Sequence, residues 1–227
     1  MIVQAEDAVS FHSKQAQDWT GQYATPTFAV RFEVLNGLLQ PRQLAGQYWL
    51  DAGCGTGTLG RWLAEKHRCR VLGVDASAEM IEQCTAVPGT EFRAIEDVCK
   101  LRLDDRQFDG VLCSSVLEYL DSPVTALREL RRVLHDDGLL LVSVPNAHFW
   151  TRLSLWVTYW ATRPLGRRRK CAFLDHSKWC FSPESFSQLL RDAGFLALDY
   201  RKYGECPLDS LGVKTEGSMI MFLAKPA

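Results

Sequence analysis

The sequence predicts an α/β fold in which a mostly parallel β-sheet carries helices on both faces and ends in an antiparallel hairpin. Two observations predict this fold. Short apolar segments alternate with segments whose apolar residues recur at helical spacing, which is typical of strands joined by crossover helices. The last two apolar segments follow each other with no helical pattern between them. The expected strands lie at 48–50, 70–74, 91–95, 108–113, 139–144, 195–203 and 219–225.

The expected helices fall between these strands. Residues 1–44 are expected to form a helical lead-in, and helical patterns follow the first two strands at 59–63 and 78–84. Ser-Pro pairs at 122–123 and 182–183 open two further helices, because serine favours the N-cap and proline the first helical position. The 227 residues, 1–227, therefore fit a single domain.

The composition narrows the classes of function. The formal net charge is −1, whereas nucleic-acid binders usually carry a basic excess, so no nucleic-acid partner is expected. No secretory signal opens the chain and no apolar segment is long enough to span a bilayer, which favours a cytoplasmic protein. The eight cysteines form no C-x-x-C pair and no histidine lies at zinc-finger spacing, which favours reduced thiols and no metal site.

The most informative segment is 50–57, in which an apolar strand runs into an acid, three glycines and a helix. Glycines at this place let the backbone approach a ligand closely. Residues 55–60 also fit the dinucleotide pattern G-x-G-x-x-G, with Asp75 twenty residues after Gly55, so a nicotinamide cofactor is an alternative. Asp51 distinguishes a nicotinamide cofactor from S-adenosylmethionine. A carboxylate repels the pyrophosphate of the first but attracts the ammonium and sulfonium groups of the second.

Two further acids follow the next expected strands. Asp75 ends the second, where a carboxylate can accept both hydroxyls of a ribose. Asp97 follows the third and can accept the adenine amino group, while the next backbone N–H meets a ring nitrogen. Each acid alone could be a helix cap or a turn residue, but three at successive strand ends favour an S-adenosylmethionine site. Its expected residues are Asp51, Gly53, Cys54, Gly55, Gly57, Asp75, Ala76, Asp97, Val98 and Ser114.

These segments resemble the class I S-adenosylmethionine-dependent methyltransferases, most closely the small-molecule type that includes the quinone-biosynthesis O-methyltransferases. Residues 50–57 resemble the first motif of that family and 74–77 the second. Residues 108–120 resemble its fourth-strand motif, and 132–138 the helix and turn that follow. The resemblance implies a Rossmann-like sheet of seven strands with the last one antiparallel, and methyl transfer from S-adenosylmethionine.

The chain departs from the quinone O-methyltransferases at one place. Those enzymes carry two acids and a histidine around the fourth-strand motif, where this sequence has Ser115, Glu118 and Tyr119. One acid and the histidine are absent, so the resemblance does not extend to a metal-assisted mechanism.

Residues 146–180 are expected to form an inserted segment on the acceptor side. The stretch 138–174 contains no acid, and its aromatic residues are followed by a run of basic ones. The aromatic helix could roof a pocket for an apolar acceptor, lie on an anionic membrane surface, or only pack on the sheet. We favour the pocket, and a lipid-like acceptor would combine it with the membrane. The expected acceptor-site residues are Tyr23, Glu118, Tyr119, Trp150, Trp156 and Trp160.

Methyl transfer requires alignment of the acceptor, exclusion of water and, for a hydroxyl acceptor, a modest base. His176 is the preferred candidate because Asp175 beside it could raise its basicity, and His148 is the second. The sequence thus predicts methyl transfer to a small apolar or aromatic acceptor, most simply at oxygen. The alternatives are an NAD(P)-dependent oxidoreductase and a noncatalytic cofactor-binding or membrane-docking module.

Overall fold

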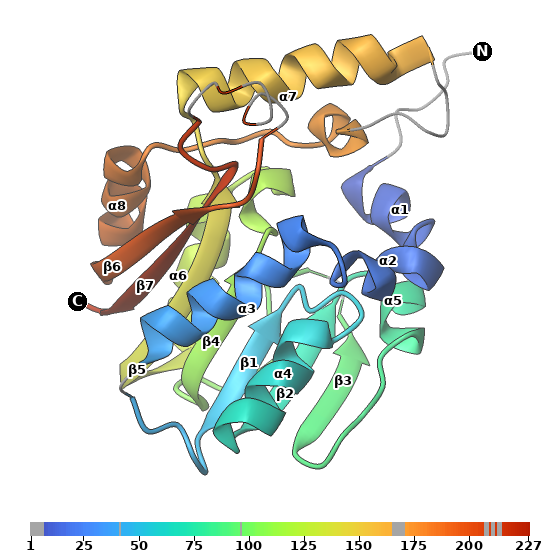
Figure 1. The fold of residues 1–227 in the computed structure, drawn as a ribbon. Coiled ribbons are helices and arrows are strands. Elements are labelled where there is room, and N and C mark those ends of the chain that lie inside the picture. Colours follow the sequence, from blue (N-terminus) through green and yellow to red (C-terminus); the bar gives the residue numbers. More distant parts are fainter. Residues whose placement is uncertain are drawn as a thin grey trace.

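The structure is a computed structural model that describes residues 7–40, 42–95, 97–164, 171–206, 209, 212 and 215–227. In this part of the chain, seven strands form one sheet in the order β3-β2-β1-β4-β5-β7-β6 (Figure 1). The last strand, β7, runs antiparallel to both of its neighbours, and the other pairings are parallel. The predicted sheet is therefore confirmed. The strands are β1 (Tyr48–Ala52), β2 (Arg70–Asp75), β3 (Thr90–Ala94), β4 (Phe108–Ser114), β5 (Leu134–Pro145), β6 (Phe195–Tyr203) and β7 (Met219–Pro226).

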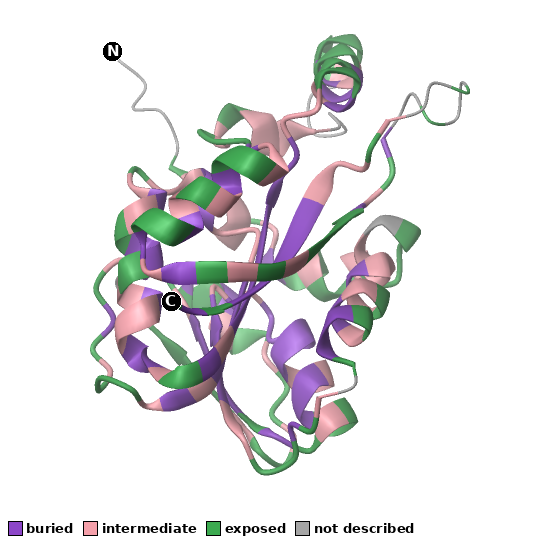
Figure 2. Ribbon diagram, turned by 90° about the vertical axis from the view of Figure 1, so that its left-hand side faces the viewer, coloured by how far each residue is buried: buried purple, intermediate pink, exposed green. Residues whose placement is uncertain are grey.

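Helices cover both faces of the sheet, and the most buried segments lie between them (Figure 2). Side chains from α3 and α4 pack on one face, and side chains from α6 and α8 pack on the other. The predicted lead-in consists of α1, α2 and α3. The helices are α1 (Ala8–Ser13), α2 (Ala16–Gln22), α3 (Pro26–Leu39), α4 (Thr58–His67), α5 (Ala78–Glu82), α6 (Pro123–Val133), α7 (Phe149–Thr162) and α8 (Pro183–Asp192), with short 3-10 helices η1 (Leu117–Tyr119) and η3 (Ala172–Asp175).

Burial on both faces explains the continuous apolar run of β5. Leu140 and Val142 belong to the core on the α6 and α8 face, whereas Leu141 belongs to the core on the α3 and α4 face. The strand begins earlier than the predicted residue 139. α6 ends at Val133, and Leu134 already pairs with Phe108 of β4.

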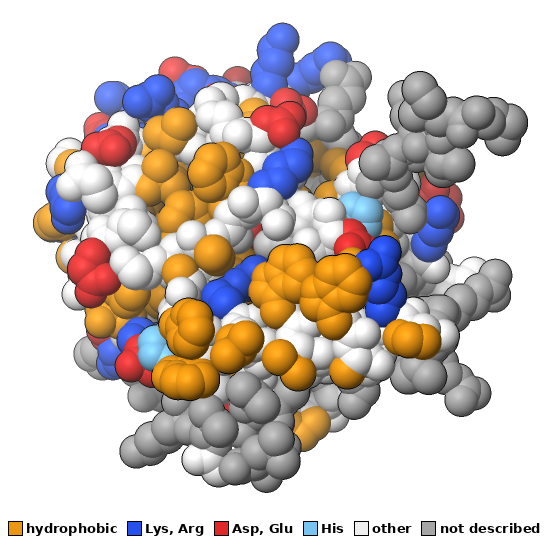
Figure 3. Space-filling view, turned by 90° about the horizontal axis from the view of Figure 1, so that it is seen from above, with side chains coloured by type: hydrophobic (Ala, Val, Ile, Leu, Met, Phe, Trp, Pro, Cys, Tyr) orange, Lys and Arg blue, Asp and Glu red, His pale blue; other side chains and the backbone are white. Residues whose placement is uncertain are grey.

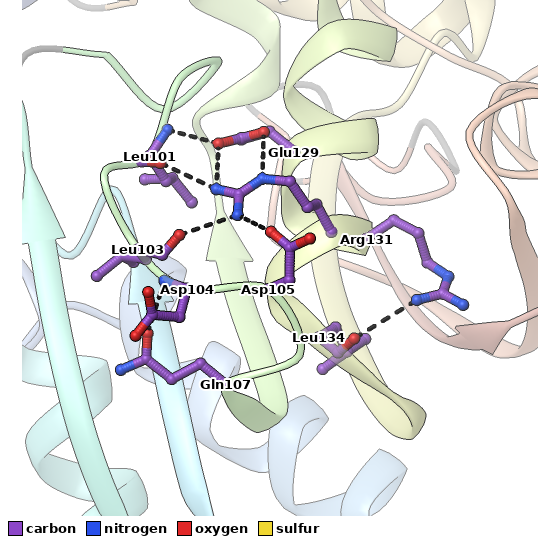
Figure 4. Close-up of polar contacts among 9 residues, drawn as sticks. Leu101, Leu103, Asp104, Asp105, Gln107, Glu129, Arg131 and Leu134 are labelled. Atoms are coloured by element: carbon purple, nitrogen blue, oxygen red, sulfur yellow. Dashed lines mark hydrogen bonds and ion pairs between the residues drawn. The ribbon is translucent and has the colours of Figure 1, made fainter.

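A polar clamp fixes the loop that leads into β4 (Figure 4). The guanidinium of Arg132 donates to the carbonyl oxygens of Leu101 and Leu103, each at 2.9 Å, and pairs with Asp105 and Glu129. The carboxylate of Glu129 in turn accepts from the amide of Leu101 at 2.8 Å. Because β4 ends beside the candidate site, this clamp anchors one of the strands on which the site is built.

Candidate functional site

The site lies where the strand order reverses. β1 and β4 are neighbours at the centre of the sheet, with β2 and β3 beyond one and β5 beyond the other. Ligands of open α/β sheets bind outside the carboxyl ends of the strands at such a point. Here that edge carries Asp51, the loop 53–57 and Ser114, whose hydroxyl lies 3.1 Å from that of Ser143 on β5.

The loop 53–57 has bare backbone because its glycines have no room for side chains. Gly53, Gly55 and Gly57 all have positive φ, at 77°, 53° and 71°. A Cβ on Gly53 would lie 2.2 Å from a methyl group of Val116, and one on Gly57 would lie 2.5 Å from the Phe92 ring. The amides of Gly53 and the buried Cys54 donate to the carbonyl oxygen of Val74 on β2, at 2.8 and 3.0 Å.

Asp51 is a buried carboxylate with an unused oxygen. It is 2% exposed, and its Oδ2 has no hydrogen-bond partner among the described residues. Burial, reinforced by the charge of Asp75, raises the pKa of Asp51 to about 7, while the nearby amide of Gly60 on α4 acts to lower it. A buried acceptor without a donor costs free energy, so the position fits a ligand that brings an N–H or a positive charge. An ammonium meets that requirement, whereas a pyrophosphate does not.

Asp75 stands next to Asp51 at the end of β2. Its two oxygens accept from the amides of Gly55 and Ser77, at 2.8 and 2.9 Å. Burial raises the pKa of Asp75, although these amide bonds act in the opposite direction. The carboxylate therefore holds the glycine loop to β2 and keeps lone pairs for a further donor. Ala76, directly after it, is exposed.

Asp97 is farther from this pair. It follows the edge strand β3, is exposed, and accepts from the amide of Cys99 at 2.8 Å. Val98 beside it is buried. Asp75 is thus hydrogen-bonded to the glycine loop and acts on Asp51 through its charge, whereas Asp97 caps the loop after the neighbouring strand end.

The lead-in helices cover the glycine loop. The indole nitrogen of Trp19 on α2 would lie 3.3 Å from a Cβ on Gly55. Thr20 donates to the hydroxyl of Thr56 at 2.9 Å, and Ser13 on α1 donates to that of Ser77 at 2.7 Å. α1 and α2 accordingly lie over the loops that follow β1 and β2, as Figure 1 shows beside α5.

Arg31 is a site residue that the sequence analysis missed. This α3 residue is 9% exposed, its Nη2 donates to the Ser115 hydroxyl at 3.3 Å, and its Nε has no partner among the described residues. Its charge also acts on Tyr23 and Glu118, as their pKa values show. The available signal was a single arginine among apolar residues in 26–32, a stretch that we interpreted only as helix.

Glu118 is a second buried acid at this edge. It lies on η1 directly after β4, is 2% exposed, and its Oε2 has no partner among the described residues. Burial raises the pKa of Glu118 to about 7, while Arg31 acts to lower it. Tyr119, the next residue, packs edge-on against His12 of α1 with ring centroids 5.0 Å apart. Burial also raises the pKa of Tyr119.

The two candidate bases lie in different places. The half-buried ring of His176 packs against Phe11 of α1 with centroids 4.5 Å apart, so it belongs to the contact between η3 and the lead-in. Asp175, expected to assist it, accepts from the Tyr159 hydroxyl at 2.5 Å. His148 precedes α7, and its Nε2 is 3.9 Å from a carboxylate oxygen of Glu216.

Trp150, Trp156 and Trp160 lie on the outer side of α7. Each is about half exposed, whereas the buried residues of this helix are Thr151, Ser154, Leu155 and Tyr159. The structure therefore does not bring these three indoles together with Glu118 and Tyr119. α7 itself passes over the carboxyl edge of the sheet (Figure 1).

The strand order, the antiparallel last strand and the acids beside a glycine loop define the class I S-adenosylmethionine-dependent methyltransferase fold. Residues 50–142 match the family described as a methyltransferase domain, and S-adenosylmethionine is the cofactor of this domain. The unpartnered Oδ2 of Asp51 fits the ammonium of that cofactor. The resemblance recognised in the sequence is therefore confirmed.

Comparisons with individual proteins agree with this assignment. The chain is 27% identical to O-methyltransferase resE of Aspergillus sclerotiorum over 169 residues, which are 69% of this chain and 57% of that protein. It is 22% identical to the mitochondrial ubiquinone biosynthesis O-methyltransferase of Dictyostelium discoideum over 178 residues, 65% of this chain and 56% of that protein. The chain spans about a third to two thirds of the length of the curated relatives that it matches first.

Solved structures share the fold. The methyltransferase in a complex with the Haloferax volcanii Trm112 activator superimposes with a TM-score of 0.71 and 16% identity, covering 98% of this chain and 99% of that one. At this identity the likeness concerns the fold alone.

Proposed function

We propose that this protein is an enzyme that transfers the methyl group of S-adenosylmethionine to a small apolar or aromatic acceptor, at oxygen. The buried carboxylate of Asp51, with an unpartnered oxygen beside the glycine loop, carries the proposal. Two curated relatives are named O-methyltransferases, which favours oxygen as the acceptor atom.

The residues that follow β1, β2 and β3 would hold the cofactor. Asp51 would accept from the ammonium group, and Asp75 would accept from the ribose hydroxyls with the lone pairs left by its two amide bonds. Asp97 and the amide of Val98 would meet the adenine edge, and Ala76 would lie beside the ribose. The backbone of 53–57, including that of Cys54, would lie close to the amino-acid part, with Ser114 at the end of β4.

Arg31 adds the charge that this arrangement lacks. The amino-acid part of the cofactor has a carboxylate as well as an ammonium, and the guanidinium of Arg31 is buried with an unpartnered Nε. We propose that Arg31, assisted by Tyr23, meets that carboxylate. Asp51 would then bind the ammonium and Arg31 the carboxylate of the same amino-acid group.

The acceptor would lie under α1, η1 and η3, where Tyr119, Glu118 and His176 converge with the lead-in. The cofactor supplies an electrophilic methyl group with a neutral thioether as leaving group. The acceptor oxygen forms the new bond to carbon as the bond from carbon to sulfur breaks, and the acceptor proton leaves to a base. His176 is the proposed base, and His148 is the second candidate.

Calorimetric titration separates this proposal from a nicotinamide enzyme. We expect the protein to bind S-adenosylhomocysteine and not NAD, and we expect Asp51→Asn to weaken that binding about tenfold or more. Binding of NAD alone would contradict the proposal. Methyl-labelled cofactor offered with a panel of phenols and carboxylic acids then tests turnover, and His176→Ala tests the base. Cofactor binding without transfer to any panel member would instead favour the noncatalytic alternative.

We also propose that the protein is cytoplasmic and contacts a membrane peripherally. α7 is the surface that favours the contact, because it exposes aromatic side chains at the edge of the sheet where the acceptor would enter.

A further inference from the structure

α7 exposes more large apolar side chains than an ordinary surface helix does. Its inner side is anchored by polar atoms: the Thr151 hydroxyl donates to the carbonyl oxygen of Gly217 at 3.3 Å, and Tyr159 donates to Asp175. Its outer side forms one helical stripe of large apolar residues that are 37–67% exposed. They are Phe149, Trp150, Leu153, Trp156, Val157 and Trp160. A helix that faces only water buries such a stripe.

The apolar stripe forms a continuous surface. Trp156 and Trp160 stack with ring centroids 6.2 Å apart, and Phe149 packs against Trp150 at 5.2 Å. Seen from above, hydrophobic side chains gather in a row, with Lys and Arg side chains and a few Asp, Glu and His side chains beside them (Figure 3). An outward row of this kind provides a large apolar contact area for a partner.

The charge around the stripe selects the partner. Residues 138–174 contain no acid, although the chain as a whole has a net charge of −1. The Arg163 guanidinium lies 4.7 Å over the Trp160 ring, at the carboxyl end of the stripe. In the sequence three arginines and a lysine follow at 167–170, outside the described residues. Apolar and cationic groups together match an anionic lipid surface.

The length of α7 decides how it meets a bilayer. Fourteen residues of α-helix extend about 21 Å, less than the ~30 Å of a hydrocarbon core. No helix in the described part of the chain is long and apolar enough to cross a membrane. A short helix with one aromatic face and a cationic carboxyl end lies in the plane of the interface.

We propose that the outer face of α7 docks this protein on an anionic lipid membrane, with its indoles in the headgroup region. This inference rests on the proposed function, because docking through α7 turns the acceptor edge of the sheet toward the bilayer. An apolar acceptor dissolved in the membrane would then reach the site without crossing water.

Vesicle flotation of the full chain tests the docking. We expect binding to vesicles that contain phosphatidylglycerol, weaker binding to pure phosphatidylcholine, and a clear loss as salt rises from about 0.05 M to about 0.5 M. The triple substitution W150A/W156A/W160A should reduce the partition coefficient about tenfold or more, with a loss of the blue shift in tryptophan fluorescence. Arg163→Gln should weaken binding to anionic vesicles and leave binding to neutral ones unchanged.

A matched control keeps the test specific. Leu196 and Leu198 on the edge strand β6 are 45% and 43% exposed, close to the values of the α7 indoles, but lie next to Asp199 and outside the acid-free stretch 138–174. L196A/L198A should bind vesicles as the unchanged protein does. No binding at low salt, or full binding by the triple variant, would overturn the proposal. If the unchanged protein does not bind vesicles but sediments as a dimer, and the triple variant sediments as a monomer, the stripe binds a second copy of the chain instead.

The two proposals can fail separately. Titration of each variant with S-adenosylhomocysteine reports the cofactor site, which lies apart from the outer face of α7. Unchanged cofactor affinity with lost vesicle binding is the expected result for the triple variant and shows that it is folded. Vesicle binding without any cofactor affinity would leave the docking intact and remove the proposed function.

Discussion

Replacing Asp51 by asparagine tests the electrostatic basis of the site. The carboxylate is 2% exposed, has an unpartnered oxygen, and has a pKa raised to about 7 by burial and by the nearby Asp75. The substitution keeps the size of the side chain and removes the charge. We expect the substitution to stabilise the protein without cofactor and to weaken the binding of the cofactor.

The magnitude follows from the pKa shift. The pKa rises from 3.8 in a free side chain to about 7 in the folded protein, so the folded chain holds this proton more tightly. The associated stability is present below pH 3.8 and is lost as the pH rises to about 7, a difference on the order of 4 kcal/mol. Asp51→Asn should recover part of it, about 1–3 kcal/mol at pH 8, since a buried amide also needs partners.

Cofactor affinity should depend on pH with the opposite sign. An ammonium favours the ionised carboxylate, so the affinity for S-adenosylhomocysteine should fall about tenfold for each pH unit below about 7. Calorimetric titrations from about pH 5.5 to about pH 8 measure this slope. Asp51→Asn should bind weakly with a flat profile. Glu118→Gln is the matched control, because Glu118 has a similar pKa without the same proposed ligand, and it should keep the slope. A flat profile in the unchanged protein would refute the reasoning.

Three further substitutions test separate parts of the structure. Arg31→Met should weaken S-adenosylhomocysteine binding about 10–100-fold but leave methylthioadenosine, which lacks the carboxylate, within about twofold; equal losses for both ligands would contradict the carboxylate contact. Gly57→Ala should lower the free energy of unfolding by about 1–3 kcal/mol in thermal melts, because Gly57 has a positive φ and an added Cβ would lie 2.5 Å from the Phe92 ring. Adding Phe92→Ala to that variant should relieve part of the loss. Arg132→Met should cost about 1–3 kcal/mol in urea unfolding by freeing two loop carbonyls and Glu129, and a change below about 0.5 kcal/mol would show that the clamp is dispensable.

The sequence predicted the parts of the site that local pattern determines. Asp51 and Asp75 each end an apolar strand, and the carboxyl ends of neighbouring parallel strands meet at one edge, so their proximity follows from the sheet. The positive φ of Gly53, Gly55 and Gly57 is also a local property, because glycine is the residue that adopts such angles without strain. Strand bounds were less exact, as the early start of β5 shows, because pairing with β4 and not hydropathy alone decides where a strand begins.

The parts that depend on distant packing could not be predicted. Arg31 is 84 residues from its partner Ser115, and nothing in a helical pattern shows which residue of α3 turns toward the site. The orientation of α7 is a similar case. Aromatic spacing predicted an apolar stripe, and we favoured a pocket beneath it, whereas the stripe faces outward and the anchoring bonds of Thr151 and Tyr159 lie on the inner side. The bond between Asp175, the residue expected to assist His176, and Tyr159 of α7 is another contact that sequence spacing did not show.

The distribution of buried charge explains why the lead-in is part of the site. Asp51 and Glu118 both lie buried with raised pKa values, so the empty protein carries acids that water would stabilise better. α1, α2 and α3 cover these acids, and Arg31 of α3 compensates part of the charge of Glu118. A ligand that carries both an ammonium and a carboxylate can satisfy Asp51 and Arg31 together, whereas a simple cation or anion can satisfy only one. On the proposed function, selectivity for an amino-acid group would thus depend on the lead-in helices, which lie far from the glycine loop in sequence and contact it directly in space.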